Sequence, residues 1–216
     1  MLAAVVENGQ IFVSSDSGAT WTASESNRNW RSITISSTGS VLIAVAQGGQ
    51  IYISSDNGSS WNTTESARDW EDVTTSANGT VIVAAVANGQ IYTSSDSGAT
   101  FTARDSVRNW TSVASSSDGV KLFSAVSGGQ LYTSTDSGAT WTARESSRNW
   151  VDVSSSAEGV RLVAVEQGGK VYSSSDSGVS WTSSGNNVGY QGIASSSDGR
   201  KIVAVAQNGQ IFTGLS

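Results

Sequence analysis

The sequence predicts an all-β protein, a β-propeller built from four-stranded antiparallel blades. Three observations predict this fold: a 40-residue internal repeat without insertions, four strand-like runs in each repeat, and glycine-containing turn pairs between the runs. A parallel β-helix has shorter coils, and a sandwich has no fixed 40-residue period. One aromatic residue marks each repeat: Trp30, Trp70, Trp110, Trp150 and Tyr190.

One unit read from residue 30 contains strand-like runs at 30–36, 41–46, 50–55 and 59–65. Pairs such as Asn-Gly and Asp-Gly join the first run to the second, and Asn-Gly or Gly-Gly joins the second to the third at six places, the last at 208–209. These pairs supply the positive φ that tight hairpins require. The second run, VLIAVA at 41–46, is apolar throughout, so both of its faces must be covered by neighbouring sheets.

Divided by this period, residues 1–216 form a single propeller domain. The units are 1–29 (partial), 30–69, 70–109, 110–149, 150–189 and 190–216 (partial). The first unit lacks its first strand and the last lacks its fourth. We expect six blades with incomplete terminal blades, since an unpacked apolar hairpin would expose an aggregation-prone edge. The alternative is five blades with shared or swapped terminal strands, so the chain is either a monomer or a strand-exchanged homo-oligomer.

The composition excludes several classes of function. A formal charge of -6 with only 12 basic residues disfavours nucleic acid and anionic membranes as partners. No apolar run approaches the length of a membrane span, and the absence of cysteine excludes disulfides and thiolate chemistry. The start MLAAVVENGQ reads as a strand and turn, so no signal peptide is expected from it, and the cellular location stays open.

An acidic turn recurs between the third and fourth runs as SSDSGATW at 14–21, SSDNGSSW at 54–61, SSDSGATF at 94–101, STDSGATW at 134–141 and SSDSGVSW at 174–181. We call these five segments the acidic boxes. The pattern S-x-D-x-G-x-[TS]-W resembles the Asp-box, or BNR repeat, of sialidases, sortilin-type receptors, reelin and propeller-type photosystem II assembly factors. The resemblance implies the propeller fold, but these families do unrelated jobs, so it does not imply one function.

The acidic boxes are predicted to be structural staples rather than sites. Each carboxylate can accept hydrogen bonds from its own turn, each glycine can take positive φ, and each aromatic can cover the turn. One carboxylate per turn falls short of what calcium sites gather, so neither a metal nor a cofactor is expected. The staple residues are Asp16, Gly18, Trp21, Asp56, Gly58, Trp61, Asp96, Gly98, Phe101, Asp136, Gly138, Trp141, Asp176, Gly178 and Trp181.

The linkers between units lie on the opposite face, where propellers most often bind ligands, and they carry the candidate site. Each of four linkers offers a carboxylate, an arginine three residues later and an aromatic, which suits a glycan or another polar small molecule. The same residues could equally form ion pairs and pack between blades. The candidates are Glu25, Arg28, Trp30, Glu65, Arg68, Trp70, Asp105, Arg108, Trp110, Glu145, Arg148 and Trp150; the fifth linker, GNNVGY at 185–190, lacks the acid and the arginine.

Three functions remain open. The sialidase branch of the resemblance implies three arginines, a Tyr and Glu nucleophile pair and an Asp acid/base, but here the arginines and tyrosines each recur in one repeated column. Near-identical blades are not expected to build the singular polar cluster that catalysis needs, and there is no histidine. We therefore expect no enzyme, but a scaffold that binds weakly and multivalently. The alternatives are an amplified or designed propeller without a ligand and, less favoured, a sialidase-type glycosidase.

Overall fold

The structure, a computed structural model, describes residues 1–207 and 209–215; the predicted turn residue Asn208 and the terminal Ser216 lie outside them. Within these residues every regular element is a strand and every strand pairing is antiparallel. No helix in the described ranges is long and apolar enough to cross a membrane. The all-β prediction is therefore confirmed.

Seventeen strands follow one another within the described ranges. Several are long and bent, because one strand continues from the second run of a unit into the third, or from the fourth run into the next unit. The strands are β1 (Leu2–Val5), β2 (Glu7–Gly9), β3 (Ile11–Ser14), β4 (Thr22–Ala23), β5 (Arg28–Ile35), β6 (Leu42–Ser54), β7 (Asn62–Thr75), β8 (Ile82–Val86), β9 (Gly89–Ser94), β10 (Thr102–Arg108), β11 (Trp110–Ser115), β12 (Leu122–Ser134), β13 (Thr142–Ser155), β14 (Leu162–Ser174), β15 (Thr182–Ser195), β16 (Lys201–Ala206) and β17 (Ile211–Leu215).

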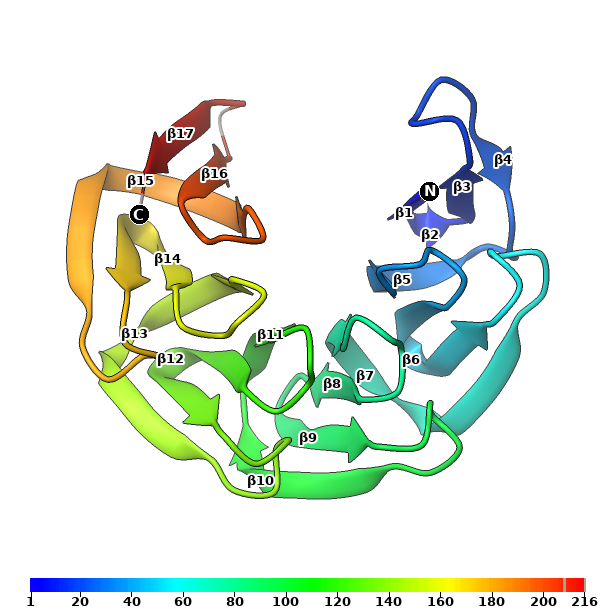
Figure 1. The fold of residues 1–216 in the computed structure, drawn as a ribbon, viewed down its shortest axis with the longest axis horizontal. Helices are drawn as coiled ribbons and strands as arrows, with labels where there is room; N and C mark the ends of the chain where they lie inside the picture. Colours follow the sequence, from blue (N-terminus) through cyan, green and yellow to red (C-terminus); the bar gives the residue numbers. More distant parts are fainter. Residues whose placement is uncertain (208, 216) are drawn as a thin grey trace.

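The strands pair in the order expected for blades. The unit at 30–69 pairs β5 with β6 and β6 with the first half of β7, whose second half pairs with β8 of the next unit. The glycine of each turn after a first run has positive φ, for example 79° at Gly39, whereas in most turns after a second run the first residue of the pair has it, as at Asn8 with 55° and Gly48 with 69°. Strand β11 lies on the inner side of the arc and β10 on the outer side (Figure 1).

Adjacent units are joined by apolar packing and by backbone hydrogen bonds. Five clusters of buried side chains each combine residues of two consecutive units; one of them places Ile43 and Val45 against Trp70 and Val73. The turns after the first strands form a chain of hydrogen bonds, in which each backbone N–H donates to the next turn at 2.8 Å, from Ser37 as far as Ser197. Each unit is therefore a blade-like sheet held to its neighbours by apolar contacts and backbone hydrogen bonds.

The arc is open, with β1, β3 and β4 at one end and β16 and β17 at the other (Figure 1). Each end exposes side chains that are buried in the interior of the arc. Leu2 is 44% exposed although the equivalent Leu42 is 0% exposed, and Val205 is 40% exposed although the equivalent Val45 is 0% exposed. The two ends expose opposite faces of a unit: one end exposes the face that contacts a preceding unit elsewhere in the arc, and the other exposes the face that contacts a following unit.

Candidate functional site

Each acidic box closes on itself through hydrogen bonds. In the box at 94–101, Asp96 Oδ1 accepts from the Thr100 N–H at 2.9 Å and from Ser94 Oγ at 2.7 Å, while Asp96 Oδ2 accepts from Thr100 Oγ1 at 2.6 Å. The hydroxyl of Ser94 also accepts from the Gly98 N–H. These bonds favour the ionised carboxylate and lower the pKa of Asp96 to about 2, and the same holds for the other box aspartates: Asp16, Asp56, Asp136 and Asp176.

The boxes also contact the preceding unit. A Cβ on Gly138 would lie 2.7 Å from Thr93 Cγ2, so only glycine fits against that strand. The ring of Trp181 stacks on Phe123 of the preceding unit, with 5.3 Å between ring centroids. Trp21, in the first unit of the arc, is 43% exposed. The box side chains are thus engaged in turn formation and in packing between units.

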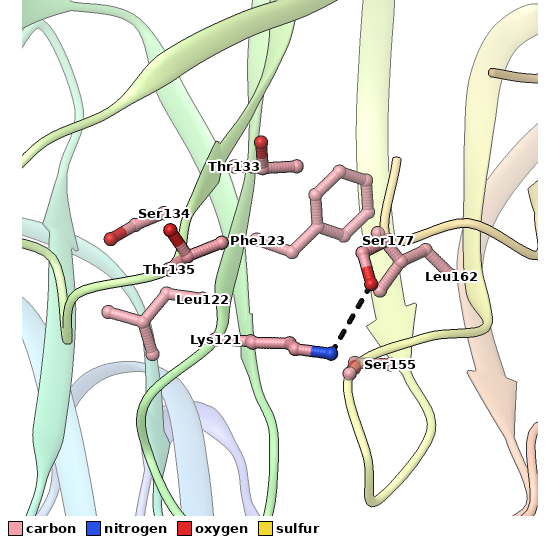
Figure 2. A pocket seen from close by; sticks show the side chains of 10 residues that line it. Lys121, Leu122, Phe123, Thr133, Ser134, Thr135, Ser155, Leu162 and Ser177 are labelled. Atoms are coloured by element: carbon pink, nitrogen blue, oxygen red, sulfur yellow. Dashed lines mark hydrogen bonds between the residues drawn. The ribbon is translucent and has the colours of Figure 1, made fainter. Parts of the chain in front are cut away.

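The gap between two units near the boxes is almost filled. Figure 2 shows Phe123, Leu162 and Ser155 around it, with Lys121 Nζ donating to Ser177 Oγ at 3.4 Å. The cavity has a volume of about 10 Å³, which is room for about one water molecule. This side of the junction cannot hold a ligand of the size of a sugar.

On the opposite face, each predicted arginine lies over a tyrosine of the following unit. The guanidinium carbon of Arg68 is 4.5 Å from the centroid of the Tyr92 ring, and that ring meets Trp70 edge-on at 5.2 Å. The other units repeat the contact at 4.5 to 5.0 Å, with the pairs Arg28 and Tyr52, Arg108 and Tyr132, and Arg148 and Tyr172. The arginine side chains remain about one-third exposed.

The predicted acids pair with these arginines within their own linkers. The oxygen-to-nitrogen distances are 3.3 Å for Glu25 and Arg28, 3.5 Å for Glu65 and Arg68, 3.5 Å for Asp105 and Arg108, and 3.8 Å for Glu145 and Arg148. The structure therefore brings together the acid and the arginine of all four linkers.

The predicted tryptophans of the linkers lie in the core. Trp30, Trp70, Trp110 and Trp150 are all buried, so these rings support the arginine–tyrosine stacks rather than presenting a face to solvent. The sequence did not reveal that Glu65, Asp105 and Glu145 have positive φ, between 47° and 63°. Gly185 stands at the corresponding place in the fifth linker, with a φ of 80°. This conformation turns the chain back over the hairpin of its unit.

A second group of polar residues lies where the first strands begin, just after the linkers. Arg31 Nη2 donates to Glu71 Oε1 at 2.5 Å, and both residues line a cavity of about 420 Å³ with Asp72 and Asp152. The expectation that near-identical units leave no singular polar cluster was wrong. The sequence contains a sign of this cluster, because the residue directly after the repeated aromatic differs in every unit. These residues are Arg31, Glu71, Thr111, Val151 and Gln191.

The two aspartates of this cluster are half-buried and act as links between units. Asp152 Oδ2 accepts from the backbone N–H of Ile193 in the next unit at 2.7 Å, and Asp152 Oδ1 accepts from Ser112 Oγ at 2.7 Å. Burial raises the pKa of Asp152, and burial together with the nearby charge of Asp152 raises the pKa of Asp72 to about 6. No group of three or more His, Cys, Asp or Glu residues in the described ranges is arranged to hold a metal ion.

Comparison with known proteins relates the chain to propellers through structure alone. No family model matches the sequence, and no curated protein matches it. The structure resembles that of an ancestral GH74 enzyme with a TM-score of 0.77 and 15% identity, covering 99% of this chain and 36% of that chain. The chain therefore spans about a third of that enzyme's length.

Two further solved structures are YCF48 proteins. YCF48 bound to D1 peptide has a TM-score of 0.72 and 18% identity, over 99% of this chain and 74% of that chain. YCF48 from Cyanidioschyzon merolae has a TM-score of 0.72 and 13% identity, over 96% of this chain and 76% of that chain. Both kinds of neighbour have β-propeller folds, so the chain is an all-β protein with a propeller-like architecture. At these identities the likeness concerns the fold only.

Proposed function

We propose that the chain is a non-enzymatic propeller scaffold that binds a glycan or another polar ligand through its linkers. The observation that carries this proposal is the fourfold arrangement of a one-third-exposed arginine over a tyrosine with a carboxylate beside it. A guanidinium held flat in this way presents fixed donors to hydroxyl and carboxylate oxygens. Several equivalent weak sites on one face gain affinity together when a ligand has several copies of the recognised group.

Unused donors support a ligand at the linkers. The Nε atoms of Arg28, Arg68 and Arg148 are buried and have no hydrogen-bond partner among the described residues. A buried donor without a partner is unfavourable, so an acceptor from a ligand or an ordered water would stabilise it. The neighbour YCF48, which is bound to D1 peptide in its solved structure, makes partner binding by such a fold plausible.

The non-enzymatic part of the proposal rests on how the central carboxylates are used. Asp72 and Asp152 accept backbone N–H groups from adjacent units, so they are engaged in holding strands together. A sialidase-type glycosidase would need free carboxylates beside a substrate. Absence of product release from a fluorogenic sialoside is the expected result, and product release above that of a denatured sample would contradict it.

The acidic boxes, in this proposal, are Asp-boxes of the BNR type that act as staples. The box side chains bond within their own turns, and the box glycines fit against the preceding unit. The rival interpretation is an amplified or designed propeller with no ligand, which is favoured by the regular spacing and short turns.

The ring, in this proposal, closes through its two ends and counts six blades, of which the terminal two are incomplete. The support comes from Leu2 and Val205, whose equivalents are covered at every internal junction. Closure would bury both faces without help from another chain. The alternative of five blades requires shared terminal strands, or their exchange with a second chain.

A binding screen tests the proposed function. The protein would be applied to a glycan array, beside the double variant Arg68→Ala, Arg108→Ala. The matched control is Arg104→Ala, Arg144→Ala, which removes the same charge from side chains that bond to threonines of the neighbouring strand. We expect a glycan signal that the linker variant loses and the control keeps. A signal unaffected by the linker variant, or no signal from any protein, would contradict the proposal.

A further inference from the structure

A cavity beside the unit at 150–189 differs from every other linker site. It has a volume of about 390 Å³ and is lined by side chains of three strands: Arg148 from β13, Glu166, Lys170 and Tyr172 from β14, and Ser183 and Asn187 from β15. This volume is within the range of small-molecule sites. Polar groups from three strands therefore surround a space large enough for a small ligand.

The cavity lies where this unit departs from the repeat. In the three preceding units a glutamine amide of the hairpin closes onto the linker: Gln50 Nε2 donates to the Glu65 carbonyl at 2.8 Å, and Gln90 and Gln130 do the same to Asp105 and Glu145. Here Lys170 replaces the glutamine and Gly185 replaces the acid. The glutamine-to-carbonyl hydrogen bond of the three preceding units therefore cannot form here, and the linker has no carboxylate at position 185.

Two cations at this cavity have donors to spare. Lys170 is exposed and has no ion-pair partner within 4.0 Å among the described residues. Arg148 lies 3.6 Å from Glu166 and 3.8 Å from Glu145, which are ion-pair rather than hydrogen-bond distances, and its Nε is buried without a partner. A guanidinium with this many free donors is suited to a planar two-oxygen acceptor.

The acid in the cavity is already engaged. Glu166 Oε2 accepts from the Tyr172 hydroxyl at 3.3 Å and lies 3.6 Å from Arg148 Nη1. The charge of Arg148 is shared between Glu166 and Glu145, so the ammonium of Lys170 is the cation at this cavity that has no ion-pair partner among the described residues. Asn187 and Ser183 add groups that can donate to and accept from hydroxyls.

We propose that this cavity is a distinct site for a small hydroxylated carboxylate, whose carboxylate lies between Lys170 and Arg148 and whose hydroxyls face Asn187 and Ser183. The inference rests on the proposed function in one respect, because Arg148 is one of the linker arginines. It adds that this site is singular and selective for anions, whereas the other linker sites are equivalent to one another.

Calorimetric titration of the whole protein with gluconate and glucuronate, beside their neutral counterparts sorbitol and glucose, tests the site. We expect saturable binding of one carboxylate per chain, on the order of 1 mM, and at least about tenfold weaker binding of the neutral compounds. Lys170→Gln, which installs the residue of the other hairpins, should weaken carboxylate binding about tenfold. Lys201→Gln, which removes the same charge from an exposed residue outside the cavity, should leave it unchanged.

The double variant Arg68→Ala, Arg108→Ala separates this inference from the proposed function. If the repeated sites do not bind but this one does, carboxylate binding survives in that variant although the glycan screen is blank. Equal binding of sorbitol and gluconate, equal binding by wild type and Lys170→Gln, or no saturable carboxylate binding would each overturn the inference.

Discussion

The carboxylate of Asp72 accepts a hydrogen bond of 2.8 Å from the backbone N–H of Val113, which lies one unit further along the chain. The same carboxylate accepts from the N–H of its neighbour Val73 at 2.9 Å. Asp152 repeats this link to Ile193 two units later. The links tie the innermost strands together, and burial of the charge makes their strength depend on pH.

Asp72→Asn should remove a pH dependence of stability. The pKa of Asp72 is raised from 3.8 to about 6, so the carboxyl stabilises the fold fully below pH 3.8, and this contribution is lost as the pH rises through 6. Wild type should lose about 2–3 kcal/mol of unfolding free energy from this group between pH 4 and 7. The variant should be less sensitive to pH and more stable than wild type at pH 7, as measured by urea unfolding.

The control for that change is Asp118→Asn, because the exposed Asp118 has a lowered pKa and titrates below this window. It should follow the wild-type profile from pH 4 to 7. A wild-type profile that does not fall, or an Asp72→Asn profile that falls equally, would refute the role given to burial.

The acidic boxes should have the opposite pH dependence. The pKa of Asp96 is lowered to about 2 by its bonds to Thr100 and Ser94, so its contribution is present above pH 3.8 and is lost as the pH falls through 2. Asp96→Asn should lower the melting temperature by a few degrees at pH 7 and reduce the further fall between pH 4 and 2. Thermal unfolding followed by tryptophan fluorescence checks this, and identical acid sensitivity of variant and wild type would argue against it.

Gly138→Ala should destabilise the junction between two units. Gly138 has a φ of 83°, and a Cβ there would lie 2.7 Å from Thr93 Cγ2 and 3.0 Å from Leu122 Cδ1. Positive φ alone costs about 1–2 kcal/mol for alanine, and overpacking adds about 1–3 kcal/mol. Gly128→Ala is the matched control, because Gly128 has a φ of 72° and nothing within 4 Å of its Cβ position. Equal losses of unfolding free energy would show that the contact contributes nothing.

Much of the fold could be predicted from the sequence because the same pattern of strands and turns recurs in each repeat. The runs, the turn glycines and the apolar second strands all follow from local patterns. The positive φ of Glu65 was not predicted, since an acid in that conformation is set by the linker's pairing with Gly49 through Arg68 rather than by propensity.

The candidate site was predicted less well, because burial depends on neighbouring units. A tryptophan beside an arginine, as in Trp70 and Arg68, reads as a binding platform in sequence, but Trp70 is enclosed between two units and only Arg68 reaches solvent. The cluster around Arg31 and Glu71 was missed because these residues are 40 positions apart in the sequence. They occupy the same position of consecutive repeats, and that position differs in each unit. Variation among otherwise equal repeats was the available signal.

Closure of the arc can be tested at its ends. Val205→Asp places a charge on the terminal face, where the equivalent Val45 is fully buried. If the ends pack together, the variant should lose about 1–3 kcal/mol of unfolding free energy and show a larger radius of gyration in X-ray scattering. Val107→Asp, on a linker where the side chain is 68% exposed, should change neither. A Val205→Asp protein indistinguishable from wild type would contradict closure.

The most direct test of the central claim is the number of ligands bound per chain, measured by calorimetry with a monovalent form of the glycan selected on the array. The account predicts about four sites, one for each arginine over a tyrosine, and about two after Arg68→Ala, Arg108→Ala. The control Arg104→Ala, Arg144→Ala should keep all of them. A stoichiometry that the linker variant leaves unchanged would contradict the account.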